Sequence, residues 1–127
     1  MAEKKRSGAP VRPLEAQVLQ FAVLGEMTRL LQRVRANKSK RAASALVKSG
    51  PIRVDVIALD EGVVLENQRV DGPFTVQCLL GRARLSVEGR DEQMTTGDLV
   101  VVDHAVVHDI RAEEATVLLF AVAPEEG

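Results

Sequence analysis

From residue 51 onward the chain alternates apolar and polar side chains with a period of two, and this alternation restricts it to β-structure. The pattern is clear over residues 52–56 and again over residues 82–88. Short turn signals, each containing a Gly, separate the alternating runs at residues 60–62, 71–73, 88–90 and 96–98. Short strands at such regular spacing are typical of an all-β sandwich or barrel. We therefore predict one β domain over residues 49–127.

The final strand differs from the others because it is apolar on both of its faces. Among residues 115–123, only Thr116 is polar. A strand that is apolar on both faces must be covered on both. One face would lie in the β core, and a helix or a partner subunit would cover the other.

Residues 14–36 have the period of an amphipathic helix. Apolar side chains recur at spacings of three and four, with two more that widen the same face: Leu19, Val23, Met27, Leu30, Val34, Leu24 and Leu31. Arg29 and Arg33 lie on the opposite face, flanked by Glu26 and Gln32, and Gly25 is a weak point at which the helix can bend. The apolar face would cover a β-sheet, a second copy of the chain, or a membrane surface.

Two further segments have the composition of irregular structure. Residues 1–13 are polar and basic and contain Pro10 and Pro13, which predicts a disordered basic tail. Residues 37–48 are predicted to be a basic connector between the helix and the β domain. Residues 14–48 thus form a helix with its connector.

Charge divides the chain into two halves that the net charge of −1 conceals. Residues 1–48 carry 11 Lys or Arg and 3 Asp or Glu, whereas residues 49–127 carry 6 and 15. Such asymmetry indicates parts with different electrostatic roles. The basic part either lies against the acidic part, within one chain or across a dimer, or contacts nucleic acid or anionic lipid. The candidate basic patch consists of Arg29, Arg33, Arg35, Lys38, Lys40 and Arg41.

Composition excludes several classes of protein. The single cysteine, Cys78, rules out an internal disulfide and fits a reducing compartment, so we predict a cytoplasmic protein. No apolar run approaches the roughly 18 residues of a spanning helix, so we predict no stable membrane insertion. The absence of Trp and Tyr disfavours base-stacking surfaces. The sequence also lacks a Gly-rich phosphate loop, a nucleophile elbow and a Cys-x-x-Cys pair.

Residues 97–108 combine a Gly-Asp turn, an apolar strand and a terminal histidine. Gly97 and His108 occupy the ends of a motif that runs Gly, five residues, Pro, any residue, Gly, two residues, His. Asp103 stands at the Pro position and Ala105 at the second Gly position. This segment resembles the second signature motif of the cupin superfamily.

The first cupin motif, which brings most of the metal ligands of that family, is recognisable between Gly62 and Gly81. It runs Gly, five residues, His, any residue, His, three or four residues, Glu, six residues, Gly. With the three-residue spacer, its His, His and Glu positions hold Gln68, Val70 and Phe74. The four-residue spacer moves the two His positions to Asn67 and Arg69. The resemblance covers residues 51–123 and implies a mainly β, jelly-roll β-barrel, here preceded by a helix, and a homodimer that pairs through strands.

Of the four metal ligands that the resemblance would supply, only His108 is present. Zinc, iron and manganese sites need three or four N, O or S donors. We therefore expect no metal cofactor, and a weak divalent metal site using His108 is the alternative. The candidate ligand pocket consists of His108, Gln68, Phe74, Cys78 and Val70. This interior either binds a small apolar ligand or is filled by side chains, as in other small barrels.

Three functions follow from these observations. The first is a metal-free, non-catalytic module that binds a small molecule or a regulatory partner. The second is a metal-dependent enzyme of the cupin type, dioxygenase-like or isomerase-like, with an atypical site around His108. The third is a nucleic-acid-associated protein that uses the basic segment 29–48.

Overall fold

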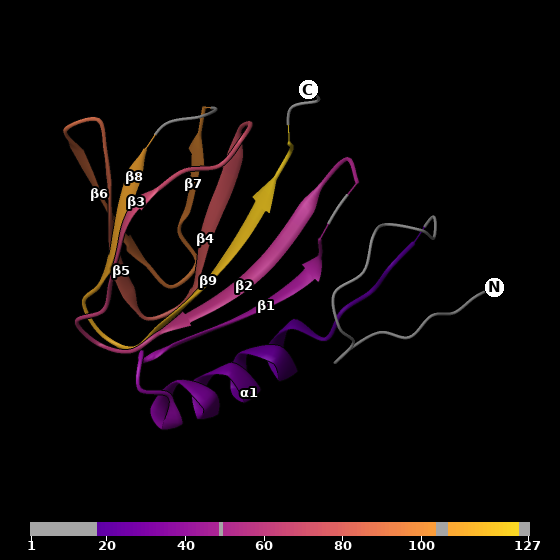
Figure 1. Cartoon of the computed structure of the whole chain (residues 1–127), viewed down its shortest axis with the longest axis vertical. Helices are drawn as coiled ribbons and strands as arrows, with labels where there is room; N and C mark the ends of the chain where they lie inside the picture. The colour runs from indigo at the N-terminus through magenta and orange to yellow at the C-terminus, as the bar shows by residue number, and fades with distance from the viewer. Residues whose placement is uncertain (1–17, 49, 104–106, 125–127) are drawn as a thin grey trace.

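The computed structural model describes residues 18–48, 50–103 and 107–124. This part of the chain contains one helix, α1 (Val23–Ala36), and nine strands. The strands are β1 (Arg41–Val47), β2 (Arg53–Leu59), β3 (Val64–Gln68), β4 (Phe74–Leu80), β5 (Arg82–Val87), β6 (Arg90–Thr95), β7 (Leu99–Val102), β8 (His108–Ala112) and β9 (Thr116–Val122). They form a five-stranded sheet in the order β1-β2-β9-β4-β7 and a four-stranded sheet in the order β3-β8-β5-β6 (Figure 1).

The two antiparallel sheets enclose the main hydrophobic core. On β4, Phe74, Val76 and Cys78 point into this core, whereas Thr75 and Gln77 alternate onto the outer face. Side chains from β5, β8 and β9 complete the same cluster. The predicted mainly β, jelly-roll architecture with an N-terminal helix is confirmed. The alternation of side chains along each strand explains this architecture, because one face of each strand is buried against the opposite sheet.

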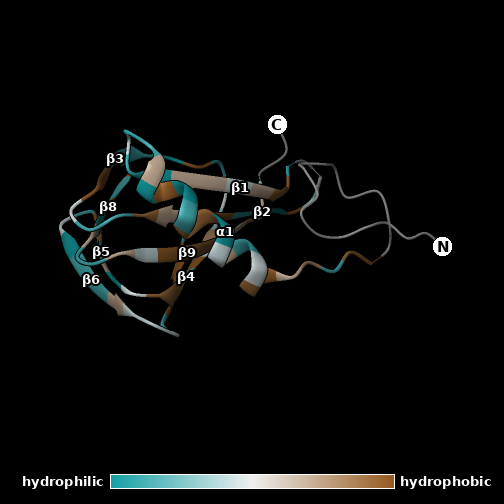
Figure 2. Cartoon of the chain, turned by 90° about the horizontal axis from the view of Figure 1, so that it is seen from below, coloured by the Kyte–Doolittle hydropathy of each residue, from teal (hydrophilic) through white to brown (hydrophobic). Residues whose placement is uncertain are grey.

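Helix α1 covers the outer face of the five-stranded sheet over β1, β2 and β9 (Figures 1 and 2). Leu30 and Val34 of the helix are buried against Val56 of β2 and Val117 of β9. This second cluster explains why β9 is apolar on both faces. Its Leu118 faces the main core, while Val117 faces the helix. Of the three surfaces proposed for the apolar face of the helix, the structure selects the sheet.

The helix begins later than its sequence pattern predicts. It starts at Val23, and residues 18–22 are not helical; residues 14–17 and the predicted tail 1–13 lie outside the described part of the chain. Leu24, predicted on the apolar face, is 77% exposed. Glu26, predicted on the polar face, is 3% exposed and forms an ion pair with Arg29. The buried face of the helix therefore includes Glu26. Burying a charged carboxylate among apolar side chains is costly unless it is paired, and the ion pair with Arg29 offsets that cost.

The prediction of a connector over residues 37–48 is wrong for residues 41–47. These residues form β1, which pairs with β2 through six register partners, such as Ala43 with Ile57. The strand was not recognised because its sequence is rich in Ala and contains few β-branched residues. Its Ala42 and Leu46 are buried beneath α1. Tertiary contact with the helix therefore overrides a weak strand propensity, and no connector separates residue 41 from the sheet.

Strand β2 presents its more apolar face to the helix rather than to the main core. Val54, Val56 and Ala58 contact the α1 cluster, while Ile57 and Leu59 belong to the main core. Because side chains alternate along a strand, Asp55 shares the inner face with Ile57.

Within the described residues, no helix is long and apolar enough to cross a bilayer.

Candidate functional site

His108, the residue that the second motif singles out, opens β8 and is 3% exposed. Its ring centroid lies 5.0 Å from that of Phe74, with the ring planes tilted by 36°. Phe74 in turn stacks on Phe120 at 6.0 Å. The histidine is thus enclosed by an aromatic cluster in which Phe74 stands where the cupin motif has a carboxylate.

The other predicted pocket residues do not all join this cluster. Val70 packs against the main core that contains Phe74, although it is only half-buried. Gln68 is the register partner of His108 but is exposed, and its Nε2 donates a hydrogen bond to the Glu66 carbonyl at 2.9 Å. The Gln68 amide therefore bonds to the backbone of its own strand, β3.

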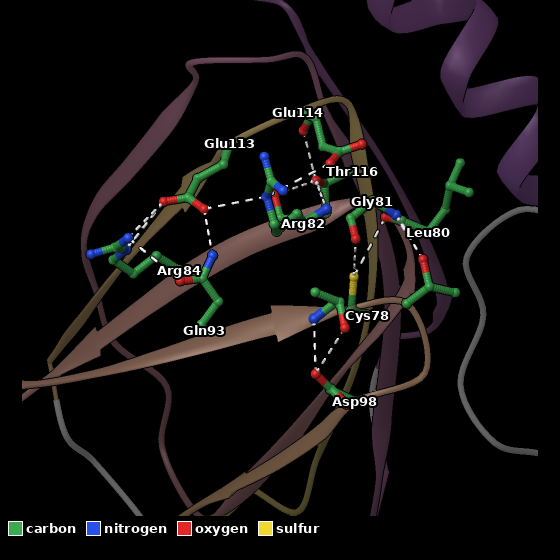
Figure 3. Close-up of polar contacts among 12 residues, drawn as sticks. Cys78, Leu80, Gly81, Arg82, Arg84, Gln93, Asp98, Glu113, Glu114 and Thr116 are labelled. Carbon is green, nitrogen blue, oxygen red and sulfur yellow. Dashed lines mark hydrogen bonds and ion pairs between the residues drawn. The ribbon is translucent and has the colours of Figure 1, made fainter.

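Cys78 lies on the same face of β4 as Phe74, four residues further along. Four residues of strand span about 13 Å, so Cys78 lies toward the other end of the core from His108. Its thiol donates to the carbonyls of Leu80 and Gly81 at 3.5 and 3.6 Å (Figure 3). Burial raises the pKa of Cys78, and this outweighs the hydrogen bond to Leu80, which lowers it. The group therefore stays a neutral thiol at neutral pH, which makes it a poor nucleophile and a poor metal ligand.

The residues present do not fit the metal ion that the cupin motifs imply. A first-row metal site requires several donors at about 2.0–2.3 Å from one point. Here Gln68 is exposed, Val70 and Phe74 carry no donor, and Cys78 is distant from His108. No group of three His, Cys, Asp or Glu side chains among the described residues could hold a metal ion. His104 and Ala105 lie outside the described residues.

A cavity of about 420 Å³ opens beside the aromatic cluster, between β5, β6 and β7. It lies where β6 and β7 end their respective sheets without pairing to each other (Figure 1). Its lining residues are Leu85, Val87, Glu88, Arg90, Glu92, Val100, Val101, Val102 and Asp103. None of them belongs to the pocket predicted from the motifs. The cavity therefore lies beside the position that His108 and Phe74 fill, and neither residue lines it.

Five of the nine residues that line the cavity are apolar and four are charged. Leu85 and Val87 of β5 oppose Val100 and Val102 of β7, and all four contribute to the main core. The charged residues come from the β5–β6 hairpin and from the end of β7: Glu88, Arg90, Glu92 and Asp103. Such a combination of apolar lining and a few polar groups is typical of small-molecule sites. Alternation in β5 and β7 predicts which side chains point inward, but only their packed volumes determine where space remains.

Asp55 is a half-buried acid that the sequence pattern did not identify as unusual. It lies opposite Ala45 of β1 and Phe120 of β9, on the inner face of β2, and is half-buried. This burial raises the pKa of Asp55 above its usual value, and the charge of Arg53 opposes the shift without cancelling it. Strand alternation alone would assign Asp55 to a solvated polar face, because Val54 and Val56 flank it.

The raised pKa makes stability depend on pH in a definite direction. In the unfolded chain an aspartate titrates near pH 3.9, so below that pH both states hold the proton and there is no penalty. As the pH rises through that value, the unfolded state ionises first, and folding is progressively penalised until the folded-state pKa is passed. We expect Asp55→Asn to raise the free energy of unfolding at about pH 7 and to change it little at about pH 3. Urea denaturation at both pH values measures this, with the exposed Asp71→Asn as control. An equal effect of Asp55→Asn at both pH values would contradict it.

Two charged clusters lie on the surface. The predicted basic patch is exposed on α1 and the segment leading into β1, where the Lys40 ammonium donates to the Arg35 carbonyl at 3.4 Å. Cations near a helix C-terminus interact favourably with its dipole. The second cluster lies on the outer face of the four-stranded sheet, where Arg84 contacts Glu113 at 3.0 Å and Arg82 contacts the same carboxylate at 3.6 Å (Figure 3). These are exposed or half-exposed ion pairs, which contribute little to stability.

No family model and no curated protein sequence matches the chain. Solved structures do match it. A conserved protein of unknown function from Streptococcus pyogenes is 22% identical, with a TM-score of 0.68, over 94% of this chain and 97% of that one. A cupin superfamily protein from Desulfitobacterium hafniense is 14% identical, with a TM-score of 0.68, over 92% of this chain and all of that one.

An enzyme is also among the similar structures. Salicylate 1,2-dioxygenase from Pseudaminobacter salicylatoxidans is 18% identical, with a TM-score of 0.66. The match covers 78% of this chain and only 33% of the dioxygenase. The similar structures thus include both catalytic and uncharacterised proteins, and at these identities they establish the architecture only. The chain has the fold of a small cupin domain.

Proposed function

We propose that the protein is a metal-free, non-catalytic module that binds a small molecule in the cavity between β5, β6 and β7. The single observation that carries this proposal is the cavity itself, whose volume of about 420 Å³ falls in the range of small-ligand sites. Its lining combines five apolar residues with four charged ones, and the charged groups would orient a ligand. The proposal replaces the pocket predicted from the motifs, because Phe74 fills that space and Gln68 turns away from it.

The lack of a metal-donor set among the described residues supports the non-catalytic part of the proposal. His108 is enclosed beside Phe74, and the Cys78 thiol bonds to backbone carbonyls at the other end of the core. These contacts leave the described residues without the convergent donors that a cupin enzyme would use. The competing proposal, a metal-dependent enzyme of the dioxygenase or isomerase type, requires metal bound by His108. Near-stoichiometric metal in the purified protein that disappears in His108→Ala would favour it.

Filling the cavity from one wall tests the binding proposal. Val100 points into the cavity, whereas its neighbour Leu99 is 57% exposed on the outer face of β7. We expect Val100→Phe to weaken the binding of a small apolar probe such as hexanol about tenfold, because the ring would occupy the ligand volume. Leu99→Phe adds the same ring to the same strand and should leave binding unchanged. The measurement is a titration followed by amide chemical shifts.

Equal binding by both variants, or shifts that fall outside β5, β6 and β7, would overturn the cavity as the site.

The nucleic-acid proposal is tested with the same preparation. Retention of DNA that weakens as salt rises, and is lost when Arg33, Arg35 and Lys38 become Gln, would support it. The predicted homodimer stays a prediction and is read from the mass of the protein in solution.

A further inference from the structure

We propose that the open edge of β7 binds an extended peptide, which adds to the sheet as a further strand and places an apolar side chain in the cavity. This inference goes beyond the small-molecule function proposed above, although both use the same cavity. Three features of β7 support it: the direction of its backbone groups, the space beside them and the apolar side chains on its outer face.

The backbone N–H and C=O groups of Val101 point away from β4. The Cys78 N–H of β4 donates to the Asp98 carbonyl at 2.9 Å, so the backbone groups of Cys78 are directed at β7. In an antiparallel ladder this direction alternates along each strand, so Val76 is hydrogen-bonded to its register partner Val100. The next residue of β7, Val101, therefore directs its N–H and C=O at the open edge. No strand among the described residues pairs with that edge.

The cavity borders this edge. Residues 100–103 all line it, including Val101, whose side chain is 69% exposed on the outer face. A strand residue whose side chain faces outward can line the cavity only through its backbone. A strand hydrogen-bonded to Val101 would lie about 4.8 Å from β7 and over the cavity, with alternate side chains directed into it. The opposite wall offers Leu85 and Val87, which suit an apolar side chain.

The outer face of β7 would also gain cover from an added strand. Leu99 and Val101 are 57% and 69% exposed there, and cross-strand neighbours would pack beside them. Charged residues on an edge strand oppose pairing with another chain. Each of the other three edge strands carries at least one, Arg41 on β1, Glu66 on β3 and Arg90 on β6, whereas β7 carries none.

A lone segment fits this edge better than a second copy of the chain. Strand β6 lies across the cavity from β7, and its Arg90 and Glu92 line that side. A second copy that paired through β7 would bring its own β6 against this one, whereas a peptide brings no second sheet. Peptides that add to a sheet edge gain affinity from main-chain hydrogen bonds and specificity from alternate side chains.

A synthetic heptapeptide, acetyl-Lys-Thr-Val-Thr-Leu-Thr-Glu-amide, is a suitable probe. Two methylated forms test for main-chain pairing: one carries N-methyl groups on Val and Leu, the other on the two Thr that flank Leu. Only one of these sets of N–H groups can face β7. We expect one form to bind like the unmethylated peptide and the other about tenfold more weakly, measured by titration of the amide chemical shifts of β7.

Val101→Pro removes the edge N–H without removing a hydrogen bond to β4, and proline is tolerated at such positions of edge strands. It should weaken binding of the unmethylated peptide about tenfold. The matched control is Ala43→Pro on β1, at the other edge of the same sheet. The Lys40 carbonyl accepts from the Asp60 N–H at 3.0 Å, so alternation directs the Ala43 N–H away from β2. This control should leave peptide binding unchanged. The methylated peptides need no variant, so they provide the test if Val101→Pro does not fold.

The outcomes separate this proposal from the small-molecule function. Equal affinity of the two methylated peptides, or equal losses in the two proline variants, would overturn strand addition. Hexanol binding without binding of any peptide would also overturn it and leave the small-molecule function standing. Methylation-dependent peptide binding without hexanol binding would support strand addition alone. A dimer that dissociates in Val101→Pro would show that a second copy occupies the edge, and would overturn the peptide as its ligand.

Discussion

Replacing Phe74 with Ala is expected to lower the free energy of unfolding by about 3–5 kcal/mol, the usual cost of removing a buried aromatic ring. Phe74 is 2% exposed, and its ring contacts both His108 and Phe120. The substitution would leave a void between three strands that cannot readily collapse onto it. Urea denaturation with linear extrapolation gives the value.

Leu99→Ala provides the control for that measurement, because Leu99 is 57% exposed on the outer face of the sheet. Its cost should stay within about 0.5 kcal/mol. A loss below about 1 kcal/mol for Phe74→Ala would mean that the ring is not enclosed in solution. The alignment of Phe74 with the carboxylate position of the first motif would then also be wrong.

Replacing Leu30 with Ala is expected to cost about 2–5 kcal/mol, because its side chain is fully buried between α1 and the sheet. Leu24 lies on the same helix, is 77% exposed, and provides a control with identical chemistry. Leu24→Ala should be nearly neutral, since Ala has the higher helix propensity and no burial is lost. Thermal and urea denaturation of the two variants measure the difference.

The comparison of these two leucines tests whether α1 is an integral part of the domain. Similar small effects at both positions would show that the helix does not dock on the sheet in solution. A large effect at Leu24 and a small one at Leu30 would indicate that the buried face of the helix is the reverse of the one described here. Only a large cost confined to Leu30 agrees with the structure.

The motif spacing predicted which residues lie near His108 better than it predicted the contacts that those residues make. Counting from Gly62 placed Phe74 at a ligand position, and the structure brings its ring to 5.0 Å from His108. The same count placed Gln68 beside them, but its amide bonds to the Glu66 carbonyl instead. Register pairs Gln68 with His108, but the register shifts between Leu65 and Gln68, and the Gln68 side chain is exposed. A local bulge of this kind has no signature in a linear motif.

The sequence by itself determined the alternating strands from residue 53 onward, the turns between them and the absence of a full set of metal donors at the motif positions. A period of two is a local property, set by alternating burial along each strand, so it can be read without knowing the neighbours. The helix period did the same for the core of α1, whose Leu30 and Val34 are buried. These features depend on the order of residues alone.

Only the tertiary structure decided what covers each face. Alternation divides β2 into two faces but does not say that Val56 meets a helix while Asp55 points inward beside Phe120. It equally could not identify β1, which becomes a strand because α1 and β2 enclose it. The cavity between β5, β6 and β7 is the clearest case. Its existence depends on the volumes of side chains from three strands and on two sheet edges that remain apart, and no single segment encodes either.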